Sequence, residues 1–126
     1  MSEETDAVID ALFASDLAKD VRSEFNVRRD EGLSVQDAAG AIFAHFRHLL
    51  DRADEGPVVI IAIAVLQQLE RAPTETIRDA AIDLLREGHG FASRPGENLM
   101  FRRDREQLRD RLIELLESPT NMPDEQ

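Results

Sequence analysis

The chain has 126 residues and no cysteine, which excludes disulfide frameworks, thiolate nucleophiles and zinc–thiolate sites. One third of the residues are charged and the net charge is −11 at pH 7, so nucleic-acid binding is disfavoured because the phosphates would be repelled. The hydrophobic fraction of 42% is sufficient for one packed domain of this length, and two domains are not expected.

Apolar residues at helical spacing run from Val8 to Phe25. They predict one long helix or two shorter helices divided near Ser15, whose side chain would cap the second helix. Gly32 is a natural stop for this segment.

The next segment begins with Ser34, a good helix N-cap, and apolar residues then recur at steps of three and four residues as far as Ala53. This pattern predicts one continuous amphipathic helix.

Nine consecutive apolar residues, Val58 to Leu66, form the most hydrophobic stretch of the chain. As a helix they would span about 14 Å, too short to cross a bilayer. Their β-branched composition is also typical of a strand, but no second strand is available to pair with it. Pro57 suits a first helical turn, and Leu69 continues the helical spacing, so we expect a buried central helix over about 57–71.

The motif "RAPTE" interrupts the chain, and a further helix follows that Gly88 would end. Residues 88–98 are rich in glycine and predict a loop before a last helix that starts near Leu99 or Arg102. Together the segments predict an all-α fold, a single-domain bundle of five or six helices in residues 1–117, with a flexible tail at 118–126. A weak similarity between "LLDRADEG" and "LLREGHG" keeps a HEAT-like helical scaffold as an alternative.

Residues 86–111 are the only mildly basic segment, with seven basic and five acidic residues in an otherwise acidic chain. Arginine forks and glycine backbone donors can hold phosphate or carboxylate, so this segment is a candidate site for an anion or a partner. The same arginines can instead pair with neighbouring carboxylates. The candidate residues are His89, Phe91, Arg94, Arg102, Arg103 and Arg105.

His45, His48 and Asp51 are three residues apart, a spacing that places metal-binding side chains on one side of a helix. Further ligands are not evident, and solvated histidines at the rim of the apolar stripe explain the same pattern. We therefore predict no metal site and no cofactor, with these three residues as weak metal candidates.

The segment 31–88, with its "EGLS" helix start, its "DEGP" turn and its alanine-rich apolar helix, resembles small all-helical bacterial proteins. Those proteins carry tryptophan near the position of Ile61 and glycine at that of Glu70. The resemblance implies an all-helical fold and a partner-binding role in bacterial accessory or toxin-neutralising systems.

Reactive side chains are scarce, and the acidic field would draw a basic protein towards the chain. We therefore expect a non-catalytic protein, not an enzyme, that binds a protein partner, such as an immunity or inhibitor protein for a basic effector. The alternative is a small anion-binding protein or enzyme that uses residues 88–105. Solubility is a second explanation of the acidity, without any role in binding. A homodimer is a further alternative. The N-terminus "MSEETDAV" lacks the features of a secretory signal, so a cytoplasmic location without membrane association is expected.

Overall fold

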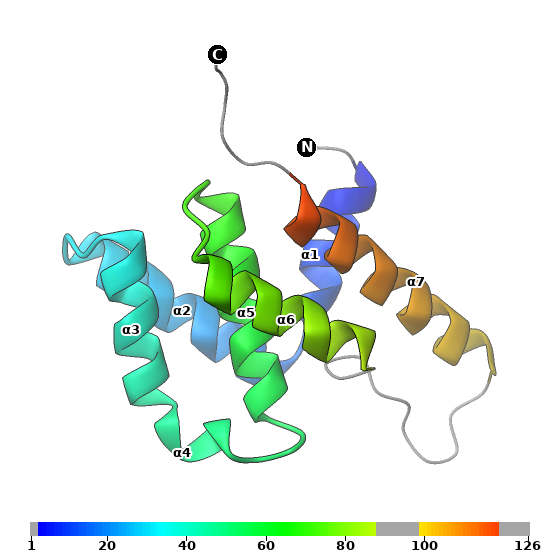
Figure 1. Cartoon of the computed structure of the whole chain (residues 1–126), viewed down its shortest axis with the longest axis horizontal. Coiled ribbons are helices and arrows are strands. Elements are labelled where there is room, and N and C mark those ends of the chain that lie inside the picture. Colours follow the sequence, from blue (N-terminus) through cyan, green and yellow to red (C-terminus); the bar gives the residue numbers. More distant parts are fainter. Residues whose placement is uncertain (1–2, 88–98, 119–126) are drawn as a thin grey trace.

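The computed structural model describes residues 3–87 and 99–118, and every regular element within these ranges is a helix. The all-α prediction is confirmed. These residues form seven helices, more than the five or six predicted (Figure 1). Their bounds are α1 (Glu3–Leu12), α2 (Asp16–Asp30), α3 (Val35–His45), α4 (Arg47–Leu50), α5 (Gly56–Leu69), α6 (Glu75–Arg86) and α7 (Leu99–Glu117).

The first predicted segment consists of two helices, α1 and α2, divided where Ser15 caps the second. Ser15 has extended backbone angles, and its Oγ accepts a hydrogen bond from the backbone N–H of Ala18 at 3.3 Å. The chain leaves α2 through Gly32, whose φ of 97° lies in the left-handed region that favours glycine. Ser15 thus caps the second helix, and Gly32 follows its end, as predicted.

The prediction of one continuous helix from Ser34 to Ala53 is wrong, because the helix is interrupted at Phe46. Ser34 does cap α3, its Oγ accepting from the N–H of Asp37 at 3.1 Å. At Phe46 the backbone turns to φ −100° and ψ 18°, and the short helix α4 follows. The Phe46 side chain is buried in the core while Leu50 is half-buried, so the turn directs apolar groups of both helices inwards.

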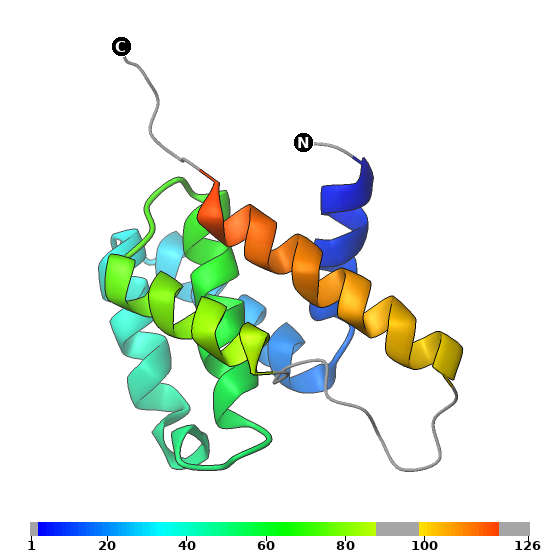
Figure 2. The ribbon, with the colours of Figure 1, turned by 45° about the vertical axis from the view of Figure 1, so that its right-hand side comes forward.

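Helix α5 is buried along nearly its whole length and contacts α2, α3, α4, α6 and α7 (Figures 1 and 2). Pro57 lies in its first turn, as the sequence indicated. Several of its side chains, among them Ile61, Ile63 and Val65, are completely shielded from solvent. The helical reading of this apolar run, against the strand alternative, is therefore correct.

Two buried glutamines at the end of α5 tie it to the next two helices. Gln67 exchanges hydrogen bonds with Thr74, the residue before α6: its Nε2 donates to Thr74 Oγ1 at 3.0 Å, and its Oε1 accepts from the Thr74 N–H at 3.1 Å. Gln68 Nε2 donates to the carbonyl oxygens of Leu115 at 3.0 Å and Ser118 at 3.1 Å, at the end of α7. These bonds fix where α6 begins and where α7 ends.

Helix α7 crosses α1 and also packs against α5 and α6 (Figure 2). Leu112 and Leu116 of α7 are fully buried in this contact region. Within residues 3–87 and 99–118, no helix combines the length and the hydropathy that crossing a bilayer requires.

Candidate functional site

The weak metal candidates do not converge. His45 ends α3 and His48 lies in α4, on the far side of the break at Phe46, and both side chains are exposed, as is Asp51. The His45 ring instead meets the Phe46 ring edge to face, with the ring centroids 4.8 Å apart. Among the described residues, no three histidine or acidic side chains are grouped as a metal site would require.

The predicted arginine-rich site falls largely outside what the structure describes. His89, Phe91 and Arg94 lie outside the described residues. Helix α7 includes the backbone of Arg102, Arg103 and Arg105, but their side chains are not among those described. The site therefore stays a prediction.

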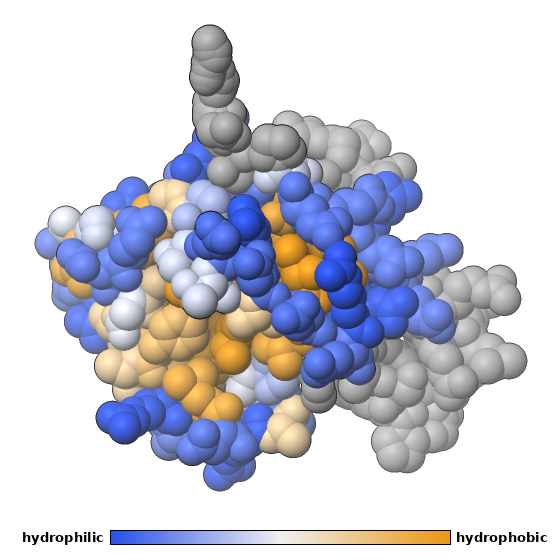
Figure 3. Space-filling model, in the orientation of Figure 1, coloured by the Kyte–Doolittle hydropathy of each residue, from blue (hydrophilic) through white to orange (hydrophobic). Residues whose placement is uncertain are grey.

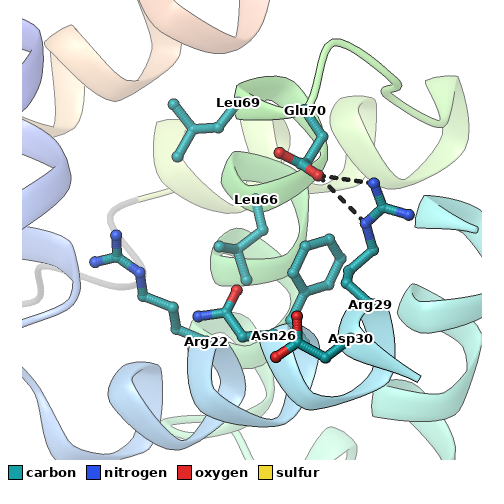
Figure 4. Close-up of a pocket in the computed structure, with 8 residues that line it drawn as sticks. Arg22, Asn26, Arg29, Asp30, Leu66, Leu69 and Glu70 are labelled. Carbon is teal, nitrogen blue, oxygen red and sulfur yellow. Dashed lines mark hydrogen bonds and ion pairs between the residues drawn. The ribbon is translucent and has the colours of Figure 1, made fainter. Parts of the chain in front are cut away.

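A pocket of about 630 Å³ lies between α2 and the end of α5 (Figure 4). Its size is within the range of small-molecule sites in proteins. Helix α2 supplies four polar side chains and one phenylalanine, and the end of α5 supplies two leucines and the carboxylate of the residue that follows them. The lining residues are Arg22, Phe25, Asn26, Arg29, Asp30, Leu66, Leu69 and Glu70.

One side of the pocket is closed by an ion pair between α2 and α5. The Nε and Nη2 atoms of Arg29 donate to Oε1 of Glu70 at 3.2 and 3.1 Å. Arg29 Nη1 also donates to the carbonyl oxygen of Leu33 at 2.8 Å, which ties the turn after α2 to the same pair. The positive charge of Arg29 is therefore already matched by a carboxylate.

The other side of the pocket carries polar groups that lack such partners. The Cζ atom of Arg22 lies 5.0 Å from the centroid of the Phe13 ring, a cation–π contact that uses no acceptor oxygen. Within the described part of the chain, neither Arg22 nor Asn26 forms a hydrogen bond or an ion pair. Arg22 and Asn26 are four residues apart on α2, so their side chains are neighbours.

A second, smaller hollow of about 480 Å³ lies between α6 and α7. Arg86 Nη2 there is 2.7 Å from Glu117 Oε2, and Arg78 Nε is 3.5 Å from Asp79 Oδ1. Both arginines of this hollow are thus already paired with carboxylates, which leaves less for a ligand than the pocket between α2 and α5.

Apolar surface is also visible between α3 and α6, above α4 (Figure 3). The half-buried side chains of these helices and of α5 include Phe43, Ile60, Ile77 and Leu84. Ile77, Ala80 and Leu84 share one flank of α6 by their spacing, and Ala80 is exposed. Gln36 on α3 donates to the Ala72 carbonyl oxygen at 3.1 Å, which places α3 beside the start of α6.

We call this surface the α3–α6 face and define it by Phe43, Ile60, Ile77, Ala80 and Leu84. Acidic residues of the same two helices, Asp37 of α3 and Glu75 and Asp83 of α6, are exposed. Both helices of the face thus also carry exposed carboxylates.

No protein-family model, no curated protein and no solved structure matches the chain. The pocket residues Arg22, Asn26, Arg29 and Glu70 were not predicted from the sequence. The positions 22, 26 and 29 do share one face of α2, but the same spacing is typical of any solvated helix face. The part played by Glu70 has no local signal, since it lies 41 residues from its partner Arg29.

Proposed function

We propose that the chain is a non-catalytic protein that binds a basic protein partner, as an inhibitor or immunity protein for a basic effector would. The observation that carries this proposal is the α3–α6 face, a continuous apolar surface on an acidic molecule (Figure 3). Apolar surfaces with a polar rim are typical of protein–protein contacts.

The charge of the chain defines the kind of partner. A net charge of −11 speeds the approach of a basic protein and slows that of an acidic one. The exposed carboxylates of Asp37, Glu75 and Asp83, on the two helices that carry the face, add to this field. Association should accordingly slow as salt is added, whereas the apolar contact should persist.

The scaffold for this face is, in our proposal, a single-domain bundle in residues 1–117 with α5 as its central helix and 118–126 as a tail. Two observations support a bundle over a HEAT-like array. Helix α5 contacts five other helices, and α1 packs against α7. Stacked repeats contact only their neighbours in the chain, so neither contact pattern is expected of an array.

The experiment compares two variants that gain the same charge. Ala80→Arg places a long cationic side chain on the α3–α6 face, where it would obstruct and repel a basic partner. Val27→Arg is the matched control, because Val27 is an exposed apolar residue of α2, 50% accessible, outside that face. Both exposed positions should accept arginine without loss of the fold, which thermal unfolding checks.

The immobilised wild-type chain would first be used to retain proteins from a cell extract at low ionic strength. Each retained protein would then be identified, purified and titrated against the wild type, Ala80→Arg and Val27→Arg. We expect a basic protein that binds the wild type and Val27→Arg equally and Ala80→Arg at least tenfold more weakly. An acidic partner, or equal binding by the two variants, would contradict the proposal. Self-association of the chain that Ala80→Arg abolishes would replace it with a homodimer interface.

The anion-binding alternative in residues 88–105 stays a prediction, to be tested on an Arg102→Ala, Arg103→Ala double variant. Loss of stabilisation by phosphate or dicarboxylates in that variant would favour it.

A further inference from the structure

The pocket between α2 and α5 has an apolar floor and a polar rim. Phe25 and Leu66 form the floor and are only 2% and 5% exposed, and Leu69 beside them is half-buried. Polar side chains make up most of the exposed lining, so apolar contact is available mainly at Leu69. A small apolar ligand body would therefore rest mainly on Leu69, with Phe25 and Leu66 beneath it.

The rim offers one uncommitted pair of hydrogen-bond donors. Arg29 is held by Glu70 and by the Leu33 carbonyl oxygen, so its donors are largely used. The Arg22 guanidinium and the Asn26 amide, side by side on α2, have no acceptor within the described residues (Figure 4). A guanidinium matches the two oxygens of a carboxylate in a forked geometry, and a neighbouring amide adds a further donor.

From this arrangement we infer that the pocket binds a small monocarboxylate with an apolar body. The carboxylate accepts hydrogen bonds from Arg22 and Asn26, and the hydrocarbon part packs mainly on Leu69. The cation–π contact with Phe13 restricts the Arg22 side chain before the ligand arrives, which lowers the entropy lost on binding.

The remaining charges of the pocket select against phosphates. Asp30 and Glu70 also line it, so its two guanidinium groups are balanced by two carboxylates. A doubly charged phosphate would gain from Arg22 but would be repelled by both carboxylates, whereas a single carboxylate meets less repulsion. An apolar body adds affinity that inorganic phosphate lacks.

The inference does not rest on the proposed partner binding, since the pocket and the α3–α6 face have no residue in common. Phenylacetate is a suitable probe because it combines one carboxylate with one ring. Its binding would be followed by amide chemical shifts in two-dimensional NMR spectra of the full chain, titrated at constant ionic strength with acetate, 2-phenylethanol and phosphate as comparison ligands.

We expect phenylacetate to shift amides in α2 and at the end of α5, with saturation. Acetate, which lacks the ring, and 2-phenylethanol, which lacks the charge, should each bind at least tenfold more weakly, and phosphate should not compete at equal concentration. Uniform binding of all anions would overturn the inference, as would shifts confined to other parts of the chain.

Three variants test the assigned residues. Arg22→Gln should weaken phenylacetate binding at least tenfold, because a charge-assisted hydrogen bond is lost. Arg47→Gln, the matched control on exposed α4, should leave the dissociation constant within twofold of the wild type. Glu70→Gln removes a negative charge from the rim and should strengthen binding. An unchanged dissociation constant in Arg22→Gln, or weaker binding in Glu70→Gln, would refute the assignment.

Discussion

Glycine-to-alanine substitution at two positions should change stability in opposite directions, because the added methyl group meets different surroundings. Gly56 begins α5 and is buried, and a Cβ there would collide with the carbonyl oxygen of Leu50. It would also lie 3.0 Å from the Leu50 carbonyl carbon and 3.2 Å from the Leu49 carbonyl oxygen. All three atoms belong to the backbone, so no side chain can move aside to relieve the overlap.

The cost at Gly56 follows from the backbone shift that the methyl group requires. Overpacking of this kind typically destabilises a protein by about 1–3 kcal/mol. The hydrogen bond from the Gly56 N–H to the Arg52 carbonyl oxygen, 3.0 Å long, would be strained by the same shift. We therefore expect Gly56→Ala to lower the free energy of unfolding by about 1–3 kcal/mol.

Gly40 provides the matched comparison, since it lies within α3, is exposed, and has no atom within 4 Å of an added Cβ. Alanine at such a helix position should stabilise the chain by about 0.5–1 kcal/mol. Urea denaturation followed by circular dichroism at 222 nm measures both changes, and each 1 kcal/mol corresponds to about 3–5 °C in the melting temperature of a chain of this length. A Gly56→Ala variant as stable as the wild type, or a destabilised Gly40→Ala variant, would refute the reasoning.

Ser34→Ala removes the side-chain acceptor at the start of α3, and the free energy of unfolding should fall by about 1 kcal/mol in the same urea titration. The ion pair of Arg29 and Glu70 should contribute little, because the two side chains are 38% and 42% exposed. A double-mutant cycle of Arg29→Gln and Glu70→Gln should give a coupling below about 1 kcal/mol that 0.5 M salt reduces further, and a larger, salt-independent coupling would contradict this.

Helix starts can be predicted from the sequence where a particular residue marks them. Ser15, Ser34 and Pro57 each lie at the helix start that their chemistry predicts. The break at Phe46 has no such signal, since the apolar spacing continues through it. It results from tertiary packing, which buries Phe46 and turns Leu50 towards α5. Intrinsic preference for a helix does not predict such a break.

The candidate pocket could be predicted only in part, for a related reason. The face of α2 that carries Arg22, Asn26 and Arg29 can be recognised from its spacing, but not which element covers it. The chain brings Glu70 to Arg29 from 41 positions away, so Arg29 is paired, whereas Arg22 has no acceptor among the described residues. The distinction between a paired and an available guanidinium, on which the ligand proposal depends, exists only in the folded chain.

The two buried glutamines of α5 should respond differently to the same substitution. Both polar atoms of the Gln67 amide are bonded to Thr74, so Gln67→Met leaves the part-buried N–H and hydroxyl of Thr74 without these partners and should cost about 1–3 kcal/mol. Gln68 donates twice, but its Oε1 is buried and accepts no hydrogen bond from the part of the chain that the structure describes. Gln68→Met removes that oxygen, the Leu115 carbonyl oxygen still accepts from the Ser118 N–H at 3.3 Å, and Ser118 itself is exposed. The loss for Gln68→Met should therefore be smaller than for Gln67→Met in parallel urea titrations, and the reverse order would mean that the attachment of α7 to α5 depends on Gln68.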